Sequence, residues 1–167
     1  MCKRIFLKSL VAGGAALAMS RLQAADKAEP ADPVILTVRG KVRGGVAQDF
    51  DARALEALGV REIHTKTQWL AAPADWSGVP LGKLLASVGA SGDTLRMRAL
   101  NDYSVTIPMA DIGRFNPVLA NRLNGKTLSV RDRGPLIVIY PYDSFPELNT
   151  QVFYDRAVWQ LREIVVE

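Results

Sequence analysis

Few side chains in this sequence are of the types that usually perform covalent or metal chemistry. Its 167 residues contain a single cysteine, Cys2, and a single histidine, His64. Thiolates are the common nucleophiles and soft-metal ligands, and zinc sites need several Cys or His side chains together. His64 has no serine and acid pattern near it, which favours a structural role. Asp143, Glu147 and Asp155 have no spacing that fixes a catalytic pair. The sequence therefore predicts no catalytic residues and no metal site.

Other side chains suit the binding of a flat polar ligand, which needs an aromatic face and a few converging hydrogen-bonding groups. Trp69 follows a predicted strand at a junction with a loop, where pocket residues often lie; capping of the core is the alternative. Asp102 could accept two N–H donors from a heterocycle, or be an ordinary turn residue. Arg133 could bind a carbonyl or a phosphate, or form a surface ion pair.

Two tyrosines follow an apolar stretch near the C-terminus. Tyr140 and Tyr142, in "IYPYDSFPELN", leave a predicted strand into a loop rich in proline and aromatic residues. Such a loop suits the rim of a site for a flat ligand, and it also suits a surface that docks a partner. Trp159 is assigned to the core, and "NGK" at 124–126 lacks the spacing of a phosphate-binding loop.

The N-terminus has the layout of a cleaved export signal. A basic start precedes an apolar run from Leu10 to Met19, and small residues follow at Ala24 and Ala25. The apolar run is too short for a permanent membrane-spanning helix. We expect residues 1–24 to be a signal, residues 25–33 a linker and residues 34–167 one domain in the periplasm. The stretch "KRIFLK" is similar to the twin-arginine export pattern with Lys3 in place of one arginine, so the export route stays open.

The charge balance excludes some classes of partner. Residues 1–24 hold four of the 21 Lys and Arg side chains and no acid, which leaves seventeen bases and seventeen acids in the remainder. A near-neutral chain is not attracted over long range to nucleic acid or to an anionic membrane. We therefore expect no nucleic-acid partner and no direct membrane insertion. The remainder also lacks cysteine, so no disulfide framework is expected.

The remaining sequence reads as short strands mixed with short helices, which indicates the α+β class with a mixed β-sheet core. Strands are expected at 34–40 and 46–50, 61–67, 94–100, 103–108, 134–141 as a central strand, and 161–167. Helices are expected at 49–59, capped by Asp49 or Asp51, and at 79–89. Turns are expected at Asn101-Asp102 and at 124–126.

Four stretches carry a resemblance to a known family. "WSGVPLGKLLASVGA", "ALNDYSVTIPMADI", "VLANRLNGKTLSVRDRGPLIVIYP" and "VWQLREIVV" occur in the order seen in the sulfite-oxidase-type molybdopterin-binding domain. The resemblance runs from about Val34 to Val166. It implies a single, largely β, sulfite-oxidase-like α+β domain with one face that grips the pterin.

The resemblance also implies roles for individual residues. A cysteine at the "HTKTQW" position ligates molybdenum in the family's enzymes, and this sequence has Thr65 or Thr67 there. Molybdenum in this family takes a deprotonated sulfur, and a threonine hydroxyl stays protonated near neutral pH, so no bound molybdenum is expected. Tyr103 matches the active-site tyrosine and Arg133 a basic cofactor ligand, while Arg156 is a weaker candidate. The residues predicted to bind the pterin are Thr65, Thr67, Trp69, Asp102, Tyr103, Arg133 and Tyr140.

Two functions compete. Small cysteine-free members of the superfamily resemble the periplasmic pterin-response proteins, which implies a reduced, monapterin-like pterin as ligand and no catalysis. It also implies a partner, the periplasmic domain of a membrane protein that controls cyclic-di-GMP and biofilm formation. The alternative is a molybdopterin-dependent oxidoreductase, or its subunit, with atypical metal ligation.

Overall fold

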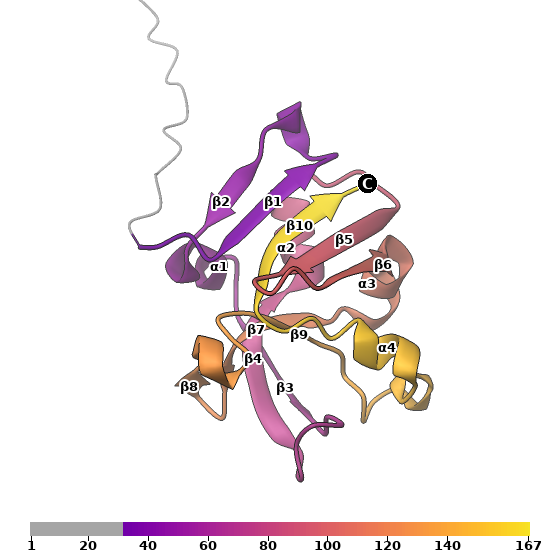
Figure 1. The fold of residues 1–167 in the computed structure, drawn as a ribbon. Coiled ribbons are helices and arrows are strands. Elements are labelled where there is room, and N and C mark those ends of the chain that lie inside the picture. The colour runs from indigo at the N-terminus through magenta and orange to yellow at the C-terminus, as the bar shows by residue number, and fades with distance from the viewer. Residues whose placement is uncertain (1–31) are drawn as a thin grey trace, which may run out of the picture.

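The computed structural model describes residues 32–167 (Figure 1). The predicted signal and most of the predicted linker lie outside the described residues. The strands are β1 (Leu36–Gly40), β2 (Gln48–Phe50), β3 (Arg61–Thr65), β4 (Ala74–Pro80), β5 (Thr94–Ala99), β6 (Ser104–Pro108), β7 (Val118–Leu123), β8 (Lys126–Thr127), β9 (Ile137–Ile139) and β10 (Leu161–Val166). The α-helices are α1 (Ala52–Ala57), α2 (Leu81–Ser87), α3 (Met109–Phe115) and α4 (Gln151–Asp155), and 3-10 turns occur at η1 (Arg43–Gly45), η2 (Val130–Asp132) and η3 (Pro146–Leu148).

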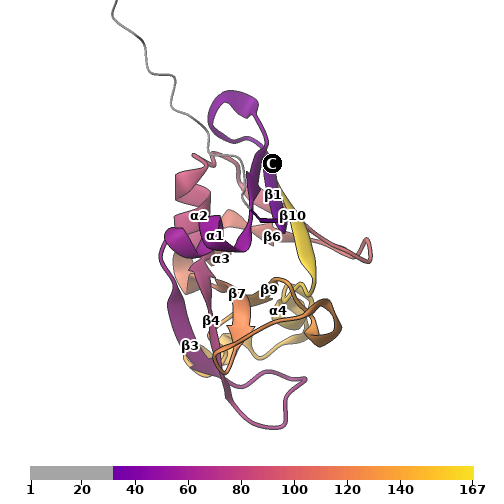
Figure 2. The ribbon, with the colours of Figure 1, turned by 90° about the vertical axis from the view of Figure 1, so that its left-hand side faces the viewer.

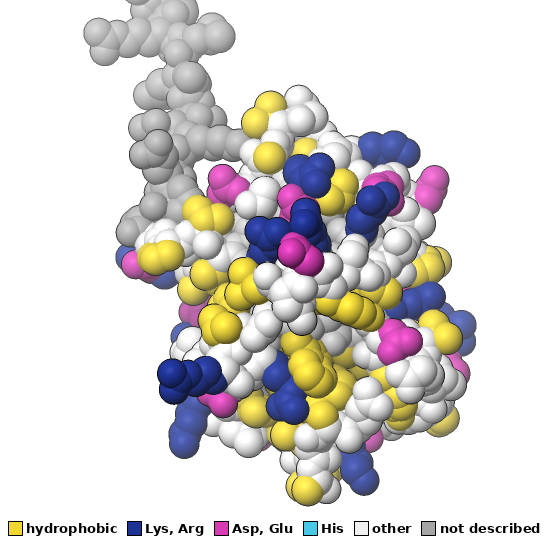
Figure 3. Space-filling model, in the orientation of Figure 1, with side chains coloured by type: hydrophobic (Ala, Val, Ile, Leu, Met, Phe, Trp, Pro, Cys, Tyr) yellow, Lys and Arg dark blue, Asp and Glu magenta, His cyan; other side chains and the backbone are white. Residues whose placement is uncertain are grey.

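The first sheet has the strand order β2-β1-β10-β5-β6, with β1 parallel to β10 and the other neighbours antiparallel. Figures 1 and 2 together show α1, α2 and α3 on one face of this sheet. The opposite face is charged, as Figure 3 shows over β1, β10 and β5. On this face Arg39 pairs with Glu163 at 2.8 Å. Buried and exposed residues alternate along β5, as a sheet with one buried face requires.

The second sheet has the order β3-β4-β7-β8, and β9 pairs with β7 as well. The central strands β4, β7 and β9 are buried on both faces, whereas β3 and β8 at the edges are largely exposed. Leu119 and Val138 join one apolar cluster, while Ala120 and Ile137 join another on the opposite face. This double burial explains why the sequence around β9 is apolar at every position rather than at every second one.

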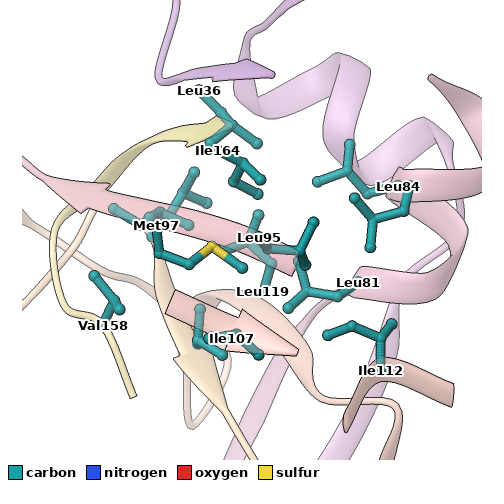
Figure 4. Close-up of a cluster of buried hydrophobic side chains, with 14 of the residues drawn as sticks. Leu36, Leu81, Leu84, Leu95, Met97, Ile107, Ile112, Leu119, Val158 and Ile164 are labelled. Atoms are coloured by element: carbon teal, nitrogen blue, oxygen red, sulfur yellow. The ribbon is translucent and has the colours of Figure 1, made fainter. Parts of the chain in front are cut away.

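The larger apolar cluster holds the two sheets and the helices together. Figure 4 shows side chains from β1, β5, β6, β7, β10, α2, α3 and the segment before β10 that converge in it: Leu36, Leu81, Leu84, Leu95, Met97, Ile107, Ile112, Leu119, Val158 and Ile164. The smaller cluster lies on the far side of the second sheet, and the partly buried ring of Trp69 packs against it. Trp69 therefore contributes to the core at the end of the loop that it occupies.

The structure confirms the α+β class and most of the local predictions. Asp51 caps α1 by accepting a hydrogen bond from the backbone N–H of Ala54 at 2.7 Å. Gly59 and Gly89 follow α1 and α2 with φ values of 101° and 63°, a conformation that favours glycine. The expected turns join β5 to β6 and β7 to β8. None of the helices in residues 32–167 combines the length and hydropathy needed to cross a bilayer.

One strand prediction was wrong. The expected central strand at 134–141 is reduced to the three residues of β9, which pairs with β7 on one side only. Its other side faces the segment before β10, where the Val138 N–H donates to the Val158 carbonyl and the Leu161 N–H donates to the Leu136 carbonyl. An irregular segment replaces a neighbouring strand there. This segment links the two sheets.

Candidate functional site

A pocket of about 620 Å³ lies where four segments meet. The loop between β3 and β4 contributes one lining residue, the β5–β6 turn two, the η2 region two, and α4 with the segment after it five. The lining residues are Gln68, Asn101, Tyr103, Arg131, Arg133, Tyr154, Asp155, Ala157, Trp159 and Gln160. The volume is within the usual range for small-molecule sites, and the lining mixes aromatic rings with hydrogen-bonding groups.

One guanidinium and two indole rings pack together at the pocket; Arg133 and Trp159 line it, and Trp69 does not. The Arg133 guanidinium lies 4.5 Å from the centre of the Trp159 ring, a favourable cation–π distance. Trp69 meets Trp159 edge to face, with 5.3 Å between ring centroids. Arg133 adopts φ 71° directly after η2, and its carbonyl accepts the Gln160 N–H at 2.9 Å. Backbone contacts thus hold both sides of this stack in place.

Three buried polar atoms in this region have no hydrogen-bond partner among the described residues. They are Thr67 Oγ1, Trp69 Nε1 and Arg133 Nε. Thr67 is only 2% exposed. Buried polar groups are nearly always paired, so each such atom calls for a partner. Four further unpaired atoms lie elsewhere in the fold, on Arg61, Trp76, Asn116 and Asn121. Of the three residues, only Arg133 lines the pocket; Thr67 and Trp69 flank the lining residue Gln68 in the β3–β4 loop.

Tyr103 closes one side of the pocket and remains partly exposed, at 43%. Its hydroxyl donates to the Asp155 carbonyl at 2.9 Å, which joins the β5–β6 turn to α4. Burial and, to a lesser extent, the Asp155 carboxylate raise the pKa of the Tyr103 phenol above its ordinary value. The phenol therefore stays protonated and acts as a hydrogen-bond donor near neutral pH.

The two threonines at the expected metal-ligand position have different surroundings. Thr65 Oγ1 accepts the Asp143 backbone N–H at 3.1 Å, and the Lys66 N–H donates to the Asp143 carboxylate at 2.8 Å. These bonds tie the end of β3 to the segment after β9. The Thr67 hydroxyl has no such partner among the described residues. Thr67 is therefore the better candidate of the two for contact with a ligand.

Asp102 does not line the pocket. It is exposed, with φ 64°, and its carboxylate pairs with Arg98 at 2.8 Å and with Arg162 at 3.4 Å. Asp102 is therefore the turn residue of the alternative interpretation. Arg156 does not line the pocket either, because it forms a partly buried ion pair with Asp111 at 2.7 Å. That pair attaches the end of α4 to α3.

Two aromatic placements predicted from the sequence were wrong. Tyr140 and Tyr142 do not form a rim, because both are at most 1% exposed and belong to the larger apolar cluster. The Tyr140 hydroxyl donates to the buried Asp111 carboxylate at 3.3 Å, and burial strongly raises the pKa of this phenol. Trp159, which was assigned to the core, is 40% exposed and lines the pocket.

Sequence reasoning also missed several lining residues, among them Gln68, Asn101, Arg131 and Gln160. Each is the sequence neighbour of a residue that was considered or lies two positions from one. Polar residues that flank a candidate aromatic or basic residue in a loop were the available signal. The sequence does not show that these four segments meet in the fold.

The family follows from a direct comparison. The oxidoreductase molybdopterin-binding domain family matches residues 50–144. The chain belongs to this family. Its match spans β2 to the segment after β9, which includes Thr67, Trp69, Tyr103 and Arg133. The protein thus contains a molybdopterin-binding, oxidoreductase-type domain, and a pterin-type ligand is what this family assignment suggests.

A solved structure supports the same fold. The chain is similar to the sulfane dehydrogenase SoxCD from Paracoccus pantotrophus, with a TM-score of 0.57 and 17% sequence identity. The match covers 78% of this chain and 37% of the SoxCD chain, so this chain spans little more than a third of that protein. The likeness shows the sulfite-oxidase-type fold alone. No curated protein matches the sequence.

The residues present fit the two parts of the family's cofactor unequally. The pocket lining offers a pterin the indole of Trp159, amide side chains and guanidinium groups, and one unpaired polar atom, Arg133 Nε, belongs to a lining residue. No thiolate is present to bind the metal, because the sequence holds no cysteine after Cys2. Residues 32–167 also contain no group of three or more His, Asp or Glu side chains that could hold an ion. The organic part fits, and the usual metal ligand is missing.

Proposed function

We propose that this domain binds a reduced, monapterin-like pterin in the pocket without catalysing a redox reaction and without molybdenum. The observation that carries the proposal is the Arg133–Trp159 stack beside unpaired polar atoms, in a chain whose metal-ligand position holds threonine. A pterin is flat and carries N–H donors next to carbonyl and ring-nitrogen acceptors. The indole of Trp159 offers an apolar surface to such a ring.

The polar lining is complementary to the edges of a pterin. The amides of Gln68, Asn101 and Gln160 each provide both donors and acceptors, and Arg131 and Arg133 provide donors only. The Tyr103 hydroxyl donates its proton to the Asp155 carbonyl, so its oxygen adds an acceptor at the pocket. This excess of donors favours a ligand with several acceptor atoms, such as the carbonyl, ring nitrogens and side-chain hydroxyls of a pterin.

We further propose that the protein acts in the periplasm and passes the presence of the ligand to the periplasmic domain of a membrane protein that controls cyclic-di-GMP and biofilm formation. The support is the similarity of the chain to small cysteine-free pterin-response proteins and the export-signal layout of residues 1–24. The alternative function, a molybdopterin-dependent oxidoreductase or its subunit with atypical ligation, is supported by the family match.

The proposal can be tested by titrating the protein with dihydromonapterin and following heat or intrinsic tryptophan fluorescence. We expect Trp159→Ala and Arg133→Ala to weaken binding about tenfold each, because the first removes the stacking surface and the second removes hydrogen-bond donors and the cation–π contact that positions Trp159. Arg114→Ala is a matched control, since Arg114 lies over the Phe115 ring at 4.9 Å on α3, away from the pocket lining. Equal affinities in all four proteins would reject this pocket as the pterin site.

A further inference from the structure

Asp155 is the one carboxylate among the residues that line the pocket. It forms no ion pair within residues 32–167. Its Oδ1 atom accepts the Gln151 side-chain amide at 2.6 Å, and its Oδ2 atom has no donor among the described residues. Burial and, second to it, this carboxylate raise the pKa of the Tyr103 phenol, so the negative charge lies close to that ring. An acid with unused lone pairs therefore borders the space that the proposed ligand would fill.

The phenol oxygens that line the pocket next to Asp155 are acceptors as well. The Tyr103 hydroxyl donates its proton to the Asp155 carbonyl at 2.9 Å, and the Tyr154 hydroxyl donates to the Asn149 side-chain oxygen at 3.3 Å. Both oxygens keep a lone pair and have no proton left for a ligand. The two arginines that line the pocket belong to the η2 region and carry donors only. The acceptors thus come from α4 and the β5–β6 turn, and the charged donors come from a different segment.

The two oxygens of a carboxylate match a ligand edge that carries two parallel N–H bonds. Carboxylates bind guanidinium groups in this way, through short, charge-assisted hydrogen bonds. An ionised carboxylate has about four lone-pair sites, so the Gln151 contact leaves room for both bonds. The pyrimidine ring of a pterin has such an edge, formed by its 2-amino group and its N3–H. In lumazine an oxygen replaces the 2-amino group, and a carboxylate placed there would face a lone pair instead of an N–H.

We propose that Asp155 is the specificity-determining residue of this site and that its carboxylate accepts the 2-amino and N3 hydrogens of the ligand. The site then selects 2-amino-4-oxo heterocycles over 2,4-dioxo heterocycles of the same shape. The ring lies against the indole of Trp159, and the acceptor atoms on its other edges remain for the arginines of the η2 region. This inference rests on the proposed function, because it assumes that a flat heterocycle fills this pocket.

Calorimetric titration with pterin and with lumazine tests the assignment. We expect the wild type to bind pterin at least about tenfold more tightly than lumazine, because a site that accepts an N–H rejects an analogue that lacks it. Asp155→Asn should bring this ratio to about one or reverse it, because an amide offers one donor and one acceptor, which match the C2 carbonyl and the N3–H of lumazine. The substitution is isosteric, and the new side-chain oxygen can still accept the Gln151 amide, so the fold should be retained.

Asp132→Asn is the matched control. It removes the same charge from an exposed acid that lies between the lining residues Arg131 and Arg133 but does not line the pocket itself, so the wild-type ratio should persist. Equal affinities of the wild type for the two heterocycles, an unchanged ratio in Asp155→Asn, or an equal loss in Asp132→Asn would overturn the inference. Pterin binding in those experiments would leave the proposed function standing. A wild type that binds no pterin would reject the proposed function and the inference with it.

Discussion

Thr65 and Thr67 show how one residue type serves two purposes two positions apart. The Thr65 hydroxyl accepts the Asp143 backbone N–H at 3.1 Å, and this hydrogen bond holds β3 to the segment after β9. The Thr67 hydroxyl is equally buried but has no partner among the described residues, which normally costs stability. An unpaired buried hydroxyl that lowers stability is expected where the hydroxyl has another role. Contact with a bound ligand is the use that our proposal assigns.

A pair of isosteric substitutions tests this difference. Thr67→Val should leave the free energy of unfolding unchanged or raise it by about 1 kcal/mol, because it removes an unpaired buried hydroxyl. It should also weaken dihydromonapterin binding severalfold. Thr65→Val should lower the free energy of unfolding by about 1 kcal/mol, because the Asp143 N–H loses its acceptor. Denaturant unfolding and calorimetric titration measure both. If Thr67→Val lowered the free energy of unfolding as much as Thr65→Val, the Thr67 hydroxyl would have a structural role instead.

At the scale of elements, α4 is a short wall of the pocket that is held in place by contacts with other segments. The helix has five residues, too few to be stable by itself. The ion pair between Arg156 and Asp111, 2.7 Å apart, ties its end to α3. On the pocket side, Tyr103 holds the Asp155 carbonyl at 2.9 Å. These two contacts, one with α3 and one with Tyr103, position Tyr154 and Asp155, which line the pocket.

Arg156→Met should lower the free energy of unfolding by about 3 kcal/mol, because it leaves the Asp111 carboxylate buried without its charge partner. It should weaken pterin binding as well, through the displaced α4 wall. The double variant Asp111→Asn/Arg156→Met should lose less stability than Arg156→Met alone, because no unpaired charge remains. Arg98→Met, which breaks an exposed pair, should change stability by less than about 1 kcal/mol. Urea unfolding of the wild type and the three variants measures these changes. Equal losses of unfolding free energy in Arg156→Met and Arg98→Met would exclude the anchoring role of Arg156.

The elements also show why some of the fold was predictable. The caps of α1 and α2 and the turns at Asn101-Asp102 and Asn124-Gly125 are set by residues within a few positions, so local sequence identified them. Tyr140 and Tyr142 were misplaced although a signal existed. Leu136 and Val138 are buried in the same cluster, and extended backbone returns every second side chain to the same side. The alternation continues through both tyrosines, and the prolines next to them obscured it.

At the scale of the whole molecule, two sheets share one core and leave a pocket and a groove where their loops meet. Four segments distant in the sequence build the pocket, and four line the groove, which lies at the starts of β1 and β10. Neither could be predicted from the sequence, because their existence depends on long-range packing. Trp159 illustrates this: its neighbour Val158 points into the core, so the indole points outwards and meets Arg133 from another loop. Trp69 was placed correctly at a loop junction, but its contact with Trp159 required the fold.

The most direct measurement of the central claim is the identity of what the protein holds in its native compartment. The protein would be purified without added ligand and denatured, the released compound identified by mass spectrometry, and molybdenum measured in the same sample. Our account predicts a reduced pterin in amounts close to those of the chain, molybdenum far below them, and loss of the pterin in the Trp159→Ala protein. Molybdenum equimolar with the chain would contradict it and favour the oxidoreductase, and a pterin retained unchanged by Trp159→Ala would contradict the assigned pocket.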